Sequence, residues 1–109
     1  MAATIAGCGH AQSVGRARIV QVAEAEYRLS PDALKLRQGP ITLVVHDFGR
    51  LAHNLAVLDG ATTVAETAPI PPGTSVTLAV YLAPGTYTLA STLLDDQSLG
   101  IRGKLTVIS

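Results

Sequence analysis

The sequence predicts an all-β domain, a Greek-key β-sandwich of about seven to eight strands. Short stretches rich in β-branched residues alternate between apolar and polar positions, and turn signals separate them at regular spacing. No long stretch has the period of a helix. The composition is 48% hydrophobic and 15% charged, against roughly 25% charged in an average soluble domain. These observations favour a sheet protein with a large core.

The length and charge of the chain limit its domain count and its partners. Its 109 residues suffice for one domain that buries a core without metals or disulfides. We expect a tail at residues 1–15 and a folded domain at residues 16–109. Eight basic and eight acidic residues give zero net charge, so we expect no nucleic-acid partner. No apolar run approaches the ~20 residues of a spanning helix.

The N-terminal stretch is small and apolar and precedes Cys8, the only cysteine. Residues 5–8, Ile-Ala-Gly-Cys, resemble the lipobox at which bacterial lipoproteins are cut and acylated. This resemblance implies an exported protein, periplasmic or extracellular, with a lipid anchor at Cys8. The stretch before Cys8 is shorter than a secretory signal. A tail with an incidental thiol and a metal pair of Cys8 and His10 are the other readings, although two ligands do not close a coordination sphere.

The first half of the domain predicts strands at residues 16–23, 34–37 and 41–46. Residues 16–23 are rich in β-branched side chains, as in a strand with one face in water. Pro31 interrupts the pattern because it removes a backbone donor and keeps the preceding residue extended. In the next two strands alternation predicts a core face made of aliphatic side chains: Leu34, Leu36, Ile41, Leu43 and Val45.

The middle of the domain is less regular. Residues 55–58 predict a short strand closed by a turn. The following stretch holds Pro69, Pro71 and Pro72, which exclude it from the centre of a sheet. We expect one turn of helix at residues 63–67.

The last third predicts a hairpin and a closing strand. Residues 76–82 alternate most regularly, and a Pro-Gly turn leads from them into residues 86–91. Residues 103–108 close the sheet. Tyr87 lies where Greek-key sandwiches place a tyrosine corner, with a buried ring and a hydroxyl bonded to backbone.

The order of several short motifs resembles the cupredoxins, the family of plastocyanin and azurin. The motifs are Ser30-Pro31-Asp32, His53-Asn54, Pro84-Gly85-Thr86-Tyr87 and Leu99-Gly100 followed by Gly103. The resemblance covers residues 16–109 and implies the fold of that family. It also implies a comparison with the blue-copper site, in which a thiolate and two imidazoles hold the ion beneath a weak axial thioether.

The resemblance implies a degenerate copper site. His53 matches the early histidine ligand of the family. Ser91 stands where the cysteine would be, Asp96 where the second histidine would be, and Ile101 where the methionine would be. Because the thiolate is missing, we expect neither blue-copper electron transfer nor a bound cofactor.

Three interpretations of these residues remain open. His53 and Asp96, joined by water or by His46, provide nitrogen and oxygen ligands for a weaker copper or zinc site. Alternatively, His53 is a buried histidine hydrogen-bonded to Asp96 or to backbone. Ser91, His53 and Asp96 are also the residue types of a hydrolytic triad. No Gly-rich nucleophile turn surrounds Ser91, so we do not expect an enzyme.

The loop before the last strand is apolar where a metal loop would carry polar ligands. Its side chains Leu93, Leu94, Leu99 and Ile101 either plug the emptied site or, where two or more stay exposed beside Leu51, form a docking patch. We therefore interpret the chain as a binding or accessory module of the cell envelope, which docks an envelope protein through Leu51, Leu93, Leu94 and Leu99. A copper-binding or electron-transfer cupredoxin is the alternative.

Overall fold

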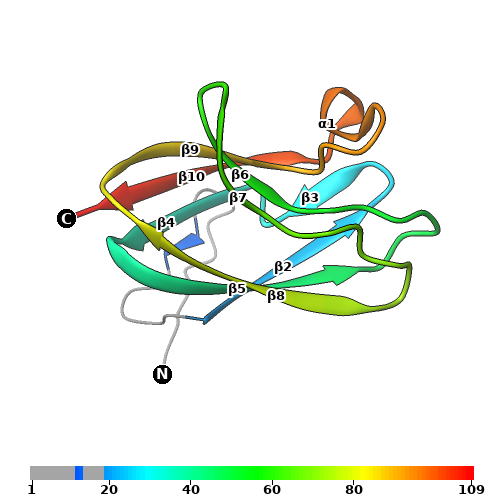
Figure 1. Cartoon of the computed structure of the whole chain (residues 1–109), viewed down its shortest axis with the longest axis horizontal. Helices are drawn as coiled ribbons and strands as arrows, with labels where there is room; N and C mark the ends of the chain where they lie inside the picture. Colours follow the sequence, from blue (N-terminus) through cyan, green and yellow to red (C-terminus); the bar gives the residue numbers. More distant parts are fainter. Residues whose placement is uncertain (1–11, 14–18) are drawn as a thin grey trace.

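Two β-sheets face each other in the computed structural model, which describes residues 12–13 and 19–109 (Figure 1). Cys8, His10 and the expected start of the domain at residue 16 lie outside the described residues. The described part contains ten strands and one short helix, α1 (Asp96–Leu99). It contains no helix long and apolar enough to cross a membrane.

The smaller sheet has four strands in the order β3 (Arg28–Ser30), β2 (Ile19–Ala25), β5 (Gly39–Asp47) and β8 (Ser75–Leu82). β2 runs parallel to β5, and β3 and β8 run antiparallel to their neighbours. β5 is the longest strand, and its residues alternate between buried and half-buried or exposed positions. It lies between β2 and β8, so both of its edges are paired.

The larger sheet has six strands, and their order shows that the chain crosses repeatedly between the two layers. The order is β1 (Gln12–Ser13), β4 (Ala33–Arg37), β10 (Arg102–Ile108), β9 (Gly85–Ala90), β6 (Ala56–Asp59) and β7 (Thr62–Glu66). β1 and β3 are two and three residues long, and the other eight strands agree with the expected number. The all-β sandwich predicted from the sequence is confirmed.

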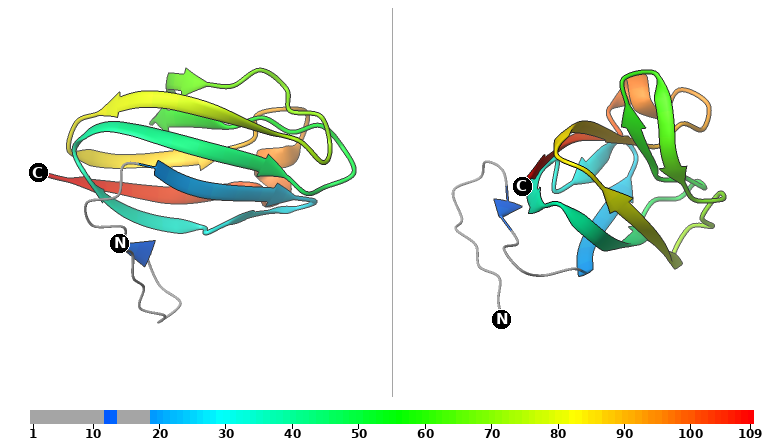
Figure 2. Two further views of the ribbon diagram at one scale, coloured as in Figure 1. Left: turned by 90° about the horizontal axis from the view of Figure 1, so that it is seen from below. Right: turned by 60° about the vertical axis from the view of Figure 1, so that its left-hand side comes forward.

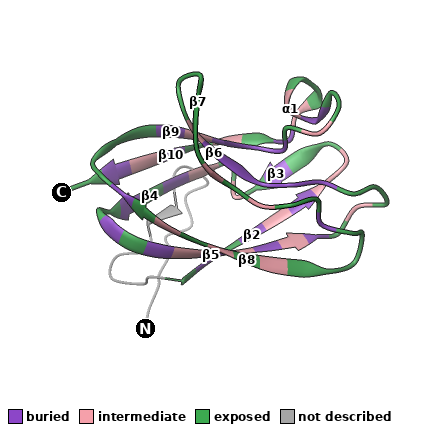
Figure 3. Ribbon diagram, in the orientation of Figure 1, coloured by how far each residue is buried: buried purple, intermediate pink, exposed green. Residues whose placement is uncertain are grey.

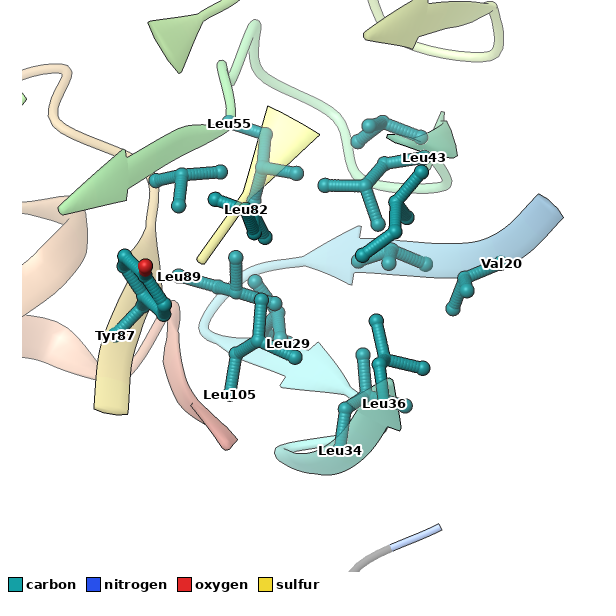
Figure 4. Packing of buried hydrophobic residues seen from close by; sticks show 14 of the residues in the cluster. Val20, Leu29, Leu34, Leu36, Leu43, Leu55, Leu82, Tyr87, Leu89 and Leu105 are labelled. Atoms are coloured by element: carbon teal, nitrogen blue, oxygen red, sulfur yellow. The ribbon is translucent and has the colours of Figure 1, made fainter. Parts of the chain in front are cut away.

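The core lies between the sheets, and alternation predicted its first members correctly. Each of the five aliphatic side chains expected on the core face is at most 2% exposed: Leu34, Leu36, Ile41, Leu43 and Val45. They belong to one buried cluster with side chains from both layers, including Leu55, Leu89 and Leu105 (Figure 4). The alternation of buried and exposed positions along these strands is visible in Figure 3.

Two expectations about local structure are wrong. Residues 63–67 do not form a helical turn, because Gly60 closes a tight turn with a φ of +61° and returns the chain along β6 as β7. β8 and β9 do not form a hairpin, because they belong to different sheets. The chain crosses between the layers just after β8, where the Tyr87 hydroxyl donates to the Ala83 carbonyl at 2.6 Å. This bond is the expected tyrosine corner.

Candidate functional site

Four residues from two separate parts of the chain meet at one end of the sandwich. Ser91 follows β9, Asp96 begins α1, and Ile101 precedes β10, while His53 comes from the loop after β5. The Ser91 N–H donates to the Ile101 carbonyl at 3.1 Å, and the Ile101 N–H donates to the Asp96 carbonyl at 2.9 Å. All four side chains are buried. The structure thus brings together the positions that the sequence comparison predicted.

A carboxylate oxygen of Asp96 lies at the centre of this group. Asp96 Oδ2 accepts a hydrogen bond from His53 Nδ1 at 2.6 Å and another from Ser91 Oγ at 2.7 Å. The same oxygen therefore joins His53 to Ser91. In a blue-copper site the two corresponding side chains converge on the ion. Here they converge on a carboxylate.

Sequence reasoning missed Glu26, which holds the other side of the imidazole. His53 Nε2 donates to Glu26 Oε2 at 2.6 Å. The Glu26 carboxylate also accepts the backbone N–H of Arg50, at 2.9 and 3.1 Å to its two oxygens, and that of Leu51 at 3.0 Å. A Cβ at position 49 would overlap this carboxylate, so the close approach requires Gly49. Glu26 fixes both the ring and the loop that carries it.

The hydrogen bonds define the charges in this group. Burial alone would lower the pKa of His53, but its bonds to Asp96 and Glu26 outweigh burial and raise that pKa above the usual value. The backbone N–H of Arg50, with smaller contributions from Leu51 and His53, lowers the pKa of Glu26 to about 2. Each ring nitrogen of His53 faces a carboxyl oxygen at 2.6 Å, so both nitrogens donate when the ring is charged. The raised pKa favours this charged form, an imidazolium between two carboxyl groups.

Asn54 fastens the two loops beside this group. Its backbone N–H donates to Ser91 Oγ at 3.1 Å, and its side-chain oxygen accepts the Thr92 N–H at 2.7 Å. Its amide nitrogen donates to Thr92 Oγ1 at 3.1 Å. The His53-Asn54 pair therefore keeps a structural role, since each residue bonds a different part of the 91–96 loop.

Two further carboxyl groups are buried close enough to His53 to interact with it electrostatically. Glu24 and Asp47 are register partners on β2 and β5, and each is 1% exposed. Both Glu24 carboxyl oxygens and Asp47 Oδ2 have no hydrogen-bond partner among the described residues. Burial raises the pKa of Glu24 to about 8. Burial therefore favours the neutral, protonated form of Glu24 near pH 7.

A signal for these two residues was present in the sequence. Alternation continues from Val20 and Val22 to Glu24, and from Val45 to Asp47, on the core faces of their strands. An acidic residue at a core position is rare unless it is paired, and so indicates a special environment. No such local signal marks Glu26, because its partners lie 24 to 27 residues away.

His46 does not join the group. It follows Val45 on the opposite face of β5, where its Nε2 donates to Gln21 Oε1. Its ring stacks on Phe48, with ring centroids 5.6 Å apart. The expectation that His46 completes a metal site with His53 therefore does not agree with its position.

The residues at this end do not fit the copper ion of a blue-copper site. The cysteine and methionine positions hold Ser91 and Ile101, and both nitrogens of His53 are engaged with carboxylates. In the described residues no group of three or more His, Cys, Asp or Glu side chains is arranged to hold a metal. The site does not fit a hydrolytic triad either. Ser91 donates to Asp96 rather than to His53, whereas a triad needs the histidine between the other two.

The apolar loop both plugs the site and faces solvent. Ile101 is fully buried, as a plug would be, and Leu93 is half-buried. In contrast, Leu94 is 96% exposed, Leu99 is 54% exposed, and Leu51 is 51% exposed. We call these three exposed side chains the end-loop surface.

The two sheets and the end at which the loops meet define the cupredoxin fold, and solved structures of that fold match the chain. The auracyanin of Roseiflexus castenholzii matches with a TM-score of 0.79 and 20% identity, over 85% of this chain and 98% of that one. Auracyanin A, a blue copper protein of Chloroflexus aurantiacus, gives 0.74 and 17%, over 82% and 97%. An azurin of Methylomonas sp. strain J gives 0.72 and 13%, over 84% and 98%.

The low sequence identity of these matches limits what they show about this chain. No protein-family model and no curated protein sequence matches the chain. At 20% identity or less, the structural matches show that the chain has the cupredoxin fold.

Proposed function

We propose that this cupredoxin-like domain works without copper, as a binding module of the bacterial cell envelope that docks a partner protein through its end-loop surface. The observation that carries the proposal is the position of Asp96 Oδ2, which bonds both His53 and Ser91. A carboxylate in this place supports the loops without an ion. The loops are then free to present apolar side chains.

The charge state of His53 argues against the copper-binding alternative. A metal ion binds the lone pair of a neutral imidazole, whereas both nitrogens of His53 donate to carboxylates. An ion at Nδ1 would have to displace a proton and break the bond to Asp96. The same network contains no thiol and no other redox-active side chain, which argues against electron transfer.

A continuous chain of hydrogen bonds connects the two loops that carry the end-loop surface. The Leu51 N–H bonds Glu26, which bonds His53, which in turn bonds Asp96 at the start of α1. Leu94 and Leu99 flank Asp96 in the sequence. Leu94 has a left-handed backbone, with a φ of 49°, which for a bulky residue costs about 1 kcal/mol or more. Strain of this kind concentrates at functional loops, and among the described residues Leu94 is the most exposed large apolar side chain.

The lipobox-like residues before Cys8 support the assignment to the cell envelope. An exported domain with a lipid at Cys8 would be held close to the membrane and would meet envelope proteins at high local concentration. The DNA upstream of the Met1 codon tests this part. A charged start followed by an apolar segment is expected there, and a sequence that encodes neither would contradict it.

We expect that Cu(II) does not bind to His53 in the folded domain. Added Cu(II) should produce no intense visible absorption and no rise in melting temperature that depends on this residue. The check is titration of the native chain and of His53→Gln, followed by absorption, paramagnetic resonance and calorimetry. Copper bound at the N-terminal tail gives the same signal in both proteins. A tetragonal signal present in the native chain and absent from His53→Gln would overturn the copper-free assignment.

Leu94→Asp is expected to weaken docking of the partner by about 10-fold or more, because burying one leucine contributes roughly 1.5–3 kcal/mol.

The partner is first identified by cross-linking. A photo-reactive residue at position 94, introduced in cells, should cross-link one envelope protein that the same residue at position 64 does not. Affinities are then measured with the purified partner. Val64→Asp is the matched control, since Val64 is an exposed apolar residue on β7. Equal affinities for Leu94→Asp and Val64→Asp would contradict the proposal.

A further inference from the structure

β8 is an open edge of the four-stranded sheet. Its eight residues pair in unbroken register with β5, beside which it lies in the left view of Figure 2, and no strand follows it in the order of that sheet. Val76, Leu78 and Val80 face the core and are only half-buried, whereas the centre of β5 is completely buried at Leu43. The edge therefore leaves apolar surface partly in water.

The pairing with β5 shows which backbone groups of β8 point to the other side of the strand. Just beyond the ladder, the Asp47 N–H donates to the Thr74 carbonyl at 2.9 Å. Antiparallel hydrogen bonds alternate along a strand, so even-numbered residues of β8 bond β5. The odd-numbered residues direct their N–H and C=O groups away from β5: Ser75, Thr77, Ala79 and Tyr81.

Among the edges of the described strands, β8 alone lacks the usual protection against pairing. β1 and β3 have two and three residues. β7 carries Glu66, and its pairing with β6 has a shift in register. In β8, by contrast, there is no charged residue, no proline and no bulge. Long, regular and uncharged edges are the ones that pair with other strands.

We propose that β8 pairs with β8 of a second copy of this chain, antiparallel across a two-fold axis at Leu78, so that two four-stranded sheets become one continuous sheet. In this register Thr77 lies opposite Ala79 of the second copy. On the inner face Val76 lies opposite Val80, and Leu78 meets its own equivalent at the axis.

The chemistry of the strand favours a second copy as the occupant. A two-fold antiparallel pairing is self-complementary, since each outward donor meets an outward acceptor of the same strand. On the inner face only aliphatic residues meet, which extends the core across the axis. β8 is uncharged and the net charge of the chain is zero, so two copies approach without repulsion.

The oligomeric state of the full chain tests the pairing. Sedimentation equilibrium from low to high micromolar concentration should show a reversible dimer. Ala79→Pro removes an outward N–H and leaves the bonds to β5 in place, so it should raise the dimer dissociation constant about 10-fold or more. Thr77→Lys should do the same by placing a charge on the edge. Thr62→Lys, on the edge strand β7, should leave the dissociation constant unchanged.

Disulfide trapping tests the register. In a Cys8→Ser background, an oxidised mixture of Thr77→Cys and Ala79→Cys chains should form covalent dimers, and neither variant alone should do so, because its two thiols lie too far apart. Circular dichroism and thermal unfolding confirm that each variant is folded. A native chain that stays monomeric at all concentrations would overturn the proposal. So would a dimer that tolerates both Ala79→Pro and Thr77→Lys.

Discussion

Replacing His53 by alanine is expected to lower the free energy of unfolding by about 3–5 kcal/mol, the effect of leaving a buried charge without its partner. The imidazolium is the shared cation of Glu26 and Asp96, with 2.6 Å from a ring nitrogen to a carboxylate oxygen on each side. The His53 side chain is completely buried, and its removal also leaves a cavity. Urea unfolding at about pH 6 measures the loss.

His46→Ala is the matched control, because His46 lies on the outer face of β5 and bonds only Gln21 among the described side chains. Its loss should stay below about 1 kcal/mol. Adding Asp96→Asn to His53→Ala should recover part of the stability, since it removes one of the unpaired charges. If His53→Ala stays within about 1 kcal/mol of the native chain, the ion network does not hold this end together.

The contribution of His53 also depends on pH in a known direction. Its pKa is raised in the folded chain, so its stabilisation is complete below the unfolded pKa of about 6.5 and is lost as the pH rises through the folded pKa. The difference between the native chain and His53→Ala should therefore shrink in alkaline buffer. Glu26 acts at the other end of the scale, because its folded pKa is about 2 and its stabilisation is lost as the pH falls towards that value.

Glu24→Gln is expected to stabilise the domain by on the order of 3 kcal/mol near pH 7. Burial raises the pKa of Glu24 from 4.5 to about 8, so the folded chain holds a proton there that the unfolded chain releases. The native stability should therefore fall as the pH rises from about 4.5 to about 8, and this part of the slope should be missing in Glu24→Gln. Denaturant unfolding at several pH values measures both slopes.

Two further variants separate charge from polarity at this position. Glu24→Leu removes the unpartnered polar group as well, so it should exceed Glu24→Gln by a similar amount at every pH. Glu66→Gln alters an exposed glutamate on β7 and should leave the slope unchanged. Equal slopes in the native chain and in Glu24→Gln would show that Glu24 ionises in the fold as it does in water.

The sequence predicted the features that depend on local pattern and on the order of motifs. Alternation identified Leu34, Leu36 and the core face of β5, and the place of Tyr87 in a Greek-key sandwich identified the tyrosine corner. The comparison with the copper family brought His53, Ser91, Asp96 and Ile101 to one end of the fold. It left open which hydrogen bonds connect them, because the position of a residue in a motif does not determine its hydrogen-bond partners.

The alternation of apolar and polar residues was enough to predict a β-sandwich. A period of two determines which side chains of a strand are buried, and it can be found in a short stretch of sequence. Only the tertiary structure decided the charges of the site. Glu26 reaches His53 across a loop, Glu24 and Asp47 meet across two strands, and β8 turns out to be an edge rather than half of a hairpin. Electrostatic partners and sheet edges arise from contacts between distant segments, and no local period encodes them.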